Sequence, residues 1–140
     1  MEKLIVLGIL DSLSQIATYV TSAAKDYGLD KKSTYKLRLA VDEIATNIII
    51  HGYQEAGKSG EIVVEAIGEN NRLTITIEDT GIAYDPTQHL LPSERELSCS
   101  LDERAVGGLG IYLVLEGVDE FSYQRDGDRN RNIFTMNLTP

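Results

Sequence analysis

An apolar stripe at helical spacing runs through the middle of the chain and carries a polar pair at its edge. The stripe predicts a helix with one face packed against the rest of the protein. Glu43 and Asn47 are four residues apart, so on this helix they lie side by side. A proton acceptor beside a neutral oxygen ligand suits phosphoryl transfer at a metal–nucleotide complex. The stripe consists of Leu37, Ala40, Val41, Ile44, Ala45 and Ile48.

Two periodic segments precede this helix. The run from Leu4 to Ile9 is rich in β-branched residues and predicts a first strand. A second stripe, over residues 13–27, predicts a helix that Asp11 or Ser12 caps and that Gly28 ends. Asp30 is the expected cap of the central helix.

Further strands are expected in the second half of the chain. Residues 62–67 and 73–77 predict two strands joined by a turn at Glu69-Asn70-Asn71. Residues 121–124 and 133–138 predict a final hairpin across the segment between them. Leu73, Ile75 and Ile77 alternate with polar residues, which is typical of a sheet with one covered face.

Three further segments are predicted not to be strands. Residues 52–60 predict a loop. Residues 83–106 have no clean period and contain two prolines, and a long segment of this kind inside one domain predicts a functional lid. Residues 111–118 predict a short helix opened by the glycines before it.

Composition narrows the class of protein. The 140 residues predict a single domain spanning 1–140, and 42% apolar residues are ordinary for a globular chain. A formal net charge of -9 argues against nucleic-acid binding through phosphates, which needs a basic face. Cys99 is the only cysteine, which excludes an intrachain disulfide and a cysteine-based zinc site. The apolar start is too short for a signal peptide or a membrane span, so we expect a cytoplasmic protein without membrane contact.

Residues 52–59 match the P-loop pattern G-x-x-x-x-G-K-S/T. A true P-loop has a strand entering and a helix leaving, so that the helix N-terminus meets the phosphates. The order expected here is the reverse, with a helix entering and a strand leaving. We therefore interpret the match as an exposed connection.

Two later segments complete a candidate nucleotide site. Asp79 ends an apolar strand, where its carboxylate can accept a hydrogen bond from the amino group of adenine, and Gly81 permits close backbone approach. An ordinary Asp-x-Gly turn is the alternative. The run Gly107-Gly108-Leu109-Gly110 opens an apolar helical segment, and its N–H groups can cradle phosphate oxygens.

In this order, the three segments resemble the anti-sigma-factor serine/threonine protein kinases of bacteria. That family belongs to the superfamily of gyrase, Hsp90, histidine kinases and MutL. The resemblance extends from the first strand to Thr135-Met136, although Ala83 stands where many superfamily members have a second glycine. Its motifs are Glu43 with Asn47, followed by His51-Gly52-Tyr53; Asp79 and Gly81 with Tyr84-Asp85-Pro86; and Gly107-Gly108-Leu109-Gly110-Ile111.

The resemblance implies an α+β fold of the Bergerat type. This is a two-layer α/β sandwich whose mixed, mostly antiparallel sheet is covered by helices on one face. It implies that ATP lies between the helices and the lid, and that Asn47 helps to hold Mg²⁺. Glu43 is the implied general base and Asp79 the adenine ligand, with Thr135 assisting. Arg104 is implied to reach the transferred phosphate.

The family also implies partners. The leading hypothesis is a kinase that phosphorylates a serine or threonine of an anti-sigma-factor antagonist, binds a sigma factor through another face and forms a homodimer. One alternative is a nucleotide-gated protein-binding module with little or no turnover. Another is an ATPase in which Glu43 activates water.

Overall fold

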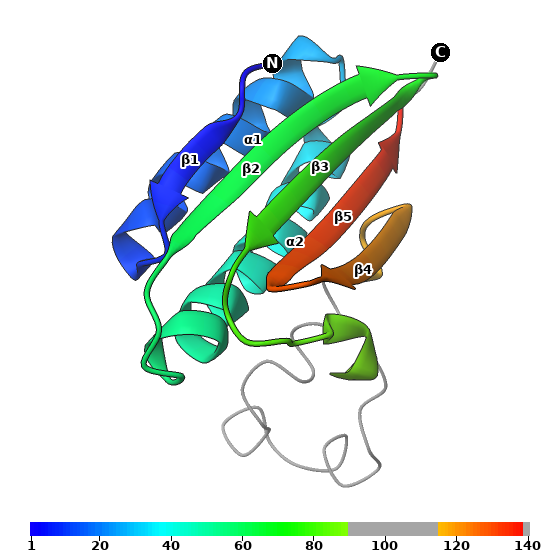
Figure 1. Ribbon diagram of the computed structural model, residues 1–140. Helices are drawn as coiled ribbons and strands as arrows, with labels where there is room; N and C mark the ends of the chain where they lie inside the picture. Colours follow the sequence, from blue (N-terminus) through cyan, green and yellow to red (C-terminus); the bar gives the residue numbers. More distant parts are fainter. Residues whose placement is uncertain (90–114, 139–140) are drawn as a thin grey trace, which may run out of the picture.

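A five-stranded sheet forms one layer of the protein, and two helices cover one of its faces (Figure 1). The computed structural model describes residues 1–89 and 115–138. The strand order is β1-β2-β3-β5-β4, and every pairing among the described strands is antiparallel. The strands are β1 (Leu4–Leu7), β2 (Glu61–Glu69), β3 (Arg72–Asp79), β4 (Glu120–Asp126) and β5 (Arg129–Asn137).

The two helices begin in different ways. Helix α1 (Leu13–Asp26) continues directly from the 3-10 turn η1 (Leu10–Ser12). Ser12 therefore already has helical backbone angles and makes no side-chain cap, so the predicted polar cap of this helix is wrong. Helix α2 (Lys31–Asn47) is capped as predicted, because the Asp30 carboxylate accepts the Ser33 N–H at 2.7 Å.

Helix α2 runs on into a π-helix, η2 (Ile48–Gln54), which takes up the first part of the predicted loop 52–60. Ile48 and Ile49 are buried, so the chain stays against the core beyond Asn47. The end of this element has the five-residue hydrogen-bond spacing of a π-helix, with the Glu55 N–H donating to the Ile50 carbonyl at 2.8 Å. Single π-turns inserted in helices occur frequently at functional sites.

The sheet follows the predicted alternation. Leu73, Ile75 and Ile77 are fully buried against the helices. The turn between β2 and β3 places Asn70 and Asn71 at φ 55° and 59°, which asparagine tolerates better than most residues. The β4–β5 turn is tighter than predicted, since the two strands extend to Asp126 and from Arg129.

The hydrophobic core lies between the sheet and the two helices. The predicted stripe of α2 is buried there, together with Ile16 and Val20 of α1 and Phe134 of β5. These observations confirm the α+β two-layer prediction. Of the predicted lid, residues 83–89 are described and include the 3-10 turn η3 (Pro86–His89), whereas residues 90–106 lie outside the described ranges. No helix within residues 1–89 and 115–138 is long and apolar enough to span a bilayer.

Candidate functional site

The edge of α2 presents the predicted polar pair. Glu43 is half-buried and Asn47 is buried, with 5% of its surface exposed. Burial raises the pKa of the Glu43 carboxyl, and the nearby Asn47 amide acts in the opposite direction. Asn47 Nδ2 nevertheless makes no hydrogen bond of good geometry. The amide nitrogen therefore lies near the Glu43 carboxyl without a hydrogen bond of normal geometry.

Three consecutive residues of η2 hold the segment that follows β3. This brings stretches far apart in the sequence to the same end of the sheet, where β3 ends and β5 begins (Figure 1). The contacts are a stack of the His51 ring on Tyr84 with 5.9 Å between centroids, an Ile82 N–H to Gly52 carbonyl bond of 3.2 Å, and a Thr80 N–H to Tyr53 hydroxyl bond of 2.8 Å.

Tyr84, in the second predicted motif, is affected by the charge of Glu43, in the first. Its pKa is raised by burial and, to a lesser extent, by the negative charge of Glu43. The segment that starts at Asp79 therefore reaches the edge of α2 where Glu43 lies. The structure brings together the first two motifs that the sequence analysis singled out.

Asp79 is buried at the end of β3, and its two oxygens have different surroundings. Oδ1 accepts the Gly81 N–H at 2.8 Å and the Asn130 Nδ2 group at 2.9 Å. Oδ2 is buried and has no hydrogen-bond partner. Burial raises the pKa of the carboxyl, while these donors and the charge of Arg125 lower it. One oxygen of the carboxylate is thus satisfied internally, whereas the other is buried without a hydrogen-bond donor.

Buried polar atoms without partners identify where a ligand fits. The described residues contain three such side-chain atoms: Asn47 Nδ2, Asp79 Oδ2 and Asn132 Oδ1. Buried polar groups are normally hydrogen-bonded, so each of these atoms needs an explanation. Two of the three belong to residues predicted from the sequence to bind nucleotide and metal.

Asn132 is a candidate that the sequence analysis missed. It is paired with Ile77 across the sheet, so its side chain lies on the helix-covered face, as does that of Asp79. The available signal was a polar residue at an inward position of an alternating strand. It was hidden because residues 125–132 were expected to be a loop.

Of the other predicted nucleotide-binding residues, Gly81 lies next to Asp79, whereas Thr135 does not. A Cβ atom on Gly81 would lie 2.8 Å from the Gly52 carbonyl oxygen, so the glycine is required by the chain's own packing, whatever its role toward a base. Thr135 is paired with Thr74, on the face of the sheet opposite to Asp79. The structure therefore does not bring Thr135 to Asp79.

The remaining predicted residues are not placed by the structure. Arg104, Gly107, Gly108, Leu109 and Gly110 lie outside the described ranges. Within those ranges, no group of three His, Cys, Asp or Glu side chains could hold a metal ion by itself.

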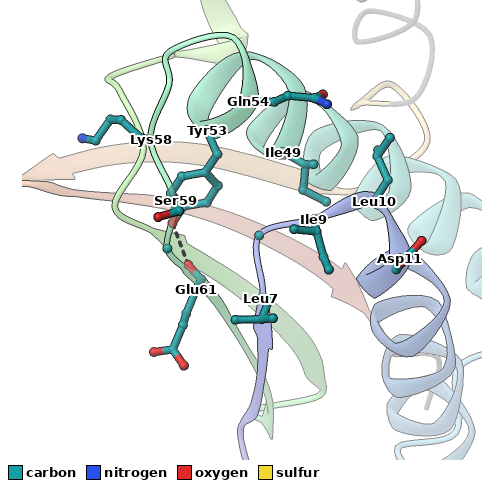
Figure 2. A pocket seen from close by; sticks show the side chains of 12 residues that line it. Leu7, Ile9, Leu10, Asp11, Ile49, Tyr53, Gln54, Lys58, Ser59 and Glu61 are labelled. Carbon is teal, nitrogen blue, oxygen red and sulfur yellow. Dashed lines mark hydrogen bonds between the residues drawn. The ribbon is translucent and has the colours of Figure 1, made fainter.

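The P-loop-like segment has the reversed order that the sequence analysis expected. The π-helix η2 enters it and β2 leaves it. Beside it lies a cavity of about 760 Å³ between the ends of β1, β2 and η2. Figure 2 shows Tyr53 at its wall, with the hydroxyl bonded to the Glu61 carbonyl at 2.7 Å. The lining includes neither Asn47 nor Asp79, so the residues predicted to bind nucleotide lie outside this cavity.

Comparison with known families agrees with this fold. Residues 9–137 match the model of the histidine kinase-like ATPase domain. The chain therefore belongs to the histidine kinase-like ATPase domain family.

Its relatives in this family include named regulatory kinases. The chain is 33% identical over 106 residues to the serine/threonine-protein kinase BtrW of Bordetella bronchiseptica, covering 76% of this chain and 72% of the relative. It is 33% identical over 94 residues to the serine-protein kinase RsbW of Bacillus pumilus, covering 63% of this chain and 56% of that relative. It is 30% identical over 97 residues to an anti-sigma F factor of Clostridium perfringens, covering 69% and 66%. The match thus spans little more than half of the Bacillus pumilus RsbW.

Solved structures support the fold alone. The histidine kinase domain of a blue-light activated histidine kinase from Erythrobacter litoralis superposes with a TM-score of 0.52 at 16% identity. The match covers 91% of this chain and 60% of that one.

Proposed function

We propose that this protein is an ATP-dependent serine/threonine protein kinase and anti-sigma regulatory factor. It phosphorylates an anti-sigma-factor antagonist and binds a sigma factor through a separate surface. The observation that carries the proposal is the buried, unpaired Oδ2 of Asp79. A buried acceptor of this kind needs a donor, and the exocyclic amino group of adenine supplies one.

Glu43 is the proposed general base. Its burial raises the pKa of the carboxyl, which makes it a better proton acceptor for an incoming hydroxyl near neutral pH than an exposed glutamate. Asn47, four residues along the same helix face, holds Mg²⁺ together with phosphate oxygens and waters. When bound, ATP and Mg²⁺ supply the transferable phosphoryl group and neutralise its charge.

The other family motifs complete the proposal. The backbone of Gly107, Gly108, Leu109 and Gly110 cradles the phosphates, and Arg104 reaches the transferred phosphate. Residues 83–106 act as a lid over the nucleotide, and two copies form a homodimer. These roles rest on the family resemblance of the motifs.

Intact-protein mass spectrometry of the antagonist tests the proposal directly. A candidate antagonist protein with a phosphorylatable serine or threonine is incubated with ATP, magnesium and either wild-type protein or the Glu43→Gln variant. We expect phosphate transfer by the wild type and a rate lower by about 10²–10⁴-fold in the variant, because a general base is lost. The exposed Glu69→Gln exchange is the matched control and retains the wild-type rate.

The other outcomes separate the rival functions. Tight ATP binding without any phosphoprotein would support the nucleotide-gated binding module. Release of inorganic phosphate without an antagonist would support an ATPase. Equal transfer by the wild type and Glu43→Gln would contradict the role given to Glu43.

A further inference from the structure

Asn130 lies at the centre of a hydrogen-bond network around Asp79 that the proposed chemistry does not use. It is buried near the start of β5, directly opposite Asp79 in the sheet. Its Nδ2 group faces Asp79 Oδ1 at 2.9 Å and the carbonyls of Gly81 and Ile82 at 3.2 and 3.0 Å. One amide therefore holds both the carboxylate and the turn that follows it.

Two donors on β4 fix the orientation of this amide. Arg125 donates from Nη1 to Asn130 Oδ1 at 3.0 Å, and the Tyr123 hydroxyl donates to the same oxygen. A guanidinium group has no acceptor, so the atom facing Arg125 must be the amide oxygen. The amide nitrogen is consequently turned toward Asp79.

This orientation decides which oxygen of Asp79 remains open. Asn130 Nδ2 and the Gly81 N–H both bind Oδ1, and Oδ2 is left buried without a partner. Arg125 also donates to the Gly81 carbonyl at 3.0 Å, and its positive charge lowers the pKa of the Asp79 carboxyl, against the burial that raises it. With both donors on Oδ1, the ionised carboxylate presents Oδ2 as an acceptor.

An acceptor at this position discriminates between purines. The 6-amino group of adenine donates a hydrogen bond, whereas the 6-oxo group of guanine is itself an acceptor and would face the carboxylate unfavourably. A site built to bond one polar group rejects an analogue that lacks it, because its own buried group stays unpaired.

We propose that Asn130, oriented by Arg125 and Tyr123, is a positioning residue that makes Asp79 selective for nucleotides with a 6-amino purine. The inference rests on the proposed function, because it concerns the same nucleotide site. It assigns to the β4–β5 hairpin a specificity role that acts through Asp79, without direct contact with the base.

Titration calorimetry with paired nucleotides tests this inference. The ligands are ATP, GTP and purine riboside 5′-triphosphate, which is ATP without the 6-amino group, each with magnesium. For Asn130→Ala we expect about a tenfold weaker affinity for ATP. The affinity for purine riboside triphosphate should change by less than about twofold, because this analogue lacks the 6-amino group that Asp79 would bind. Tyr123→Phe keeps the amide and should lose about threefold for ATP.

The control comes from the same hairpin. Arg129 pairs with Glu78 on the open face of the sheet, so Arg129→Gln should leave both affinities unchanged. If Asn130→Ala leaves the ratio of the affinities for ATP and the analogue unchanged, the inference is overturned, while ATP binding by the wild type still stands. If Asn130→Ala does not fold, an unchanged ratio in both Tyr123→Phe and Arg125→Gln overturns it. A wild type that binds neither nucleotide removes the proposed function and this inference together.

Discussion

Tyr53 shows how a single side chain supports the site. Its ring is buried, and its hydroxyl accepts the Thr80 N–H at 2.8 Å and donates to the Glu61 carbonyl at 2.7 Å. The hydroxyl therefore ties the end of β3 to the start of β2, next to Asp79.

The Tyr53→Phe variant should accordingly lose stability. Removing the hydroxyl leaves a partly buried N–H and carbonyl without a partner, which we expect to cost about 1–3 kcal/mol in the free energy of unfolding. Urea denaturation measures this loss. Tyr35→Phe alters an exposed tyrosine and should change the free energy little. Equal stability of the two variants would contradict the role of the Tyr53 hydroxyl.

Asp79 makes the stability of the protein depend on pH. Burial raises the pKa of its carboxyl above the ordinary value of 3.8. The folded state therefore holds this proton more tightly than the unfolded state, and the associated stability is present below the ordinary pKa. It is lost as the pH rises through the folded pKa.

The Asp79→Asn variant should lack this part of the pH dependence. We expect the free energy of unfolding of the wild type to decline, relative to that of the variant, as the pH increases from the ordinary aspartate pKa toward neutrality. Denaturation at a series of pH values measures the difference. Asp128→Asn, at the exposed β4–β5 turn, is the control for loss of one negative charge and should not show this divergence. Parallel curves for the wild type and Asp79→Asn would rule the effect out.

At the scale of elements, η2 and the segment after β3 are packed backbone against backbone. Gly81 lies so close to η2 that a Cβ atom would meet the Gly52 carbonyl oxygen at 2.8 Å. Backbone atoms cannot move aside as a flexible side chain would, so this contact is intolerant of added volume.

The two glycines at this crossing should respond differently to alanine. Gly81→Ala should destabilise the protein by about 1–3 kcal/mol, because the segment must shift away from η2. A Cβ atom on Gly52 would have its nearest neighbour at 3.8 Å, an ordinary contact, so Gly52→Ala should cost less. Thermal unfolding of both variants compares them, and a greater loss for Gly52→Ala would show that the crossing is more tolerant at Gly81 than the packing indicates.

At the scale of the whole molecule, the described helices and strands share one core. Core residues come from α1, α2 and strands β1, β2, β3 and β5, and the partly buried Phe121 of β4 packs against them. A shared core of this size favours all-or-none unfolding. The chain contains seven tyrosines and no tryptophan, so tyrosine fluorescence reports on the packing of the whole protein.

Unfolding in urea should therefore give coincident transitions by tyrosine fluorescence and far-ultraviolet circular dichroism. If the proposed function is right, ATP with magnesium at 100 times its dissociation constant should raise the free energy of unfolding by about 2.7 kcal/mol. Separate transitions by the two probes would indicate more than one folding unit. An unchanged midpoint with saturating ATP would count against a nucleotide site.

Much of the fold could be predicted because helices and strands have local signatures. The stripe of α2, the Asp30 cap and the alternation of Leu73, Ile75 and Ile77 are visible in short windows of sequence. The π-helix η2 could not be predicted, because three successive isoleucines before Gly52 have no distinctive period. The tight β4–β5 turn was missed because inward Asn130 and Asn132 broke the apolar alternation of β5.

The amino-acid sequence alone indicated three of the chemical groups of the candidate site, since Glu43, Asn47 and Asp79 stand in recognisable motifs. Only the tertiary structure decided how they are arranged. It placed the segment after β3 along η2, put Thr135 on the opposite face of the sheet and surrounded Asp79 with Asn130 and Arg125. These contacts join residues far apart along the chain, and their geometry depends on strand register and helix packing, which no local pattern of residues specifies.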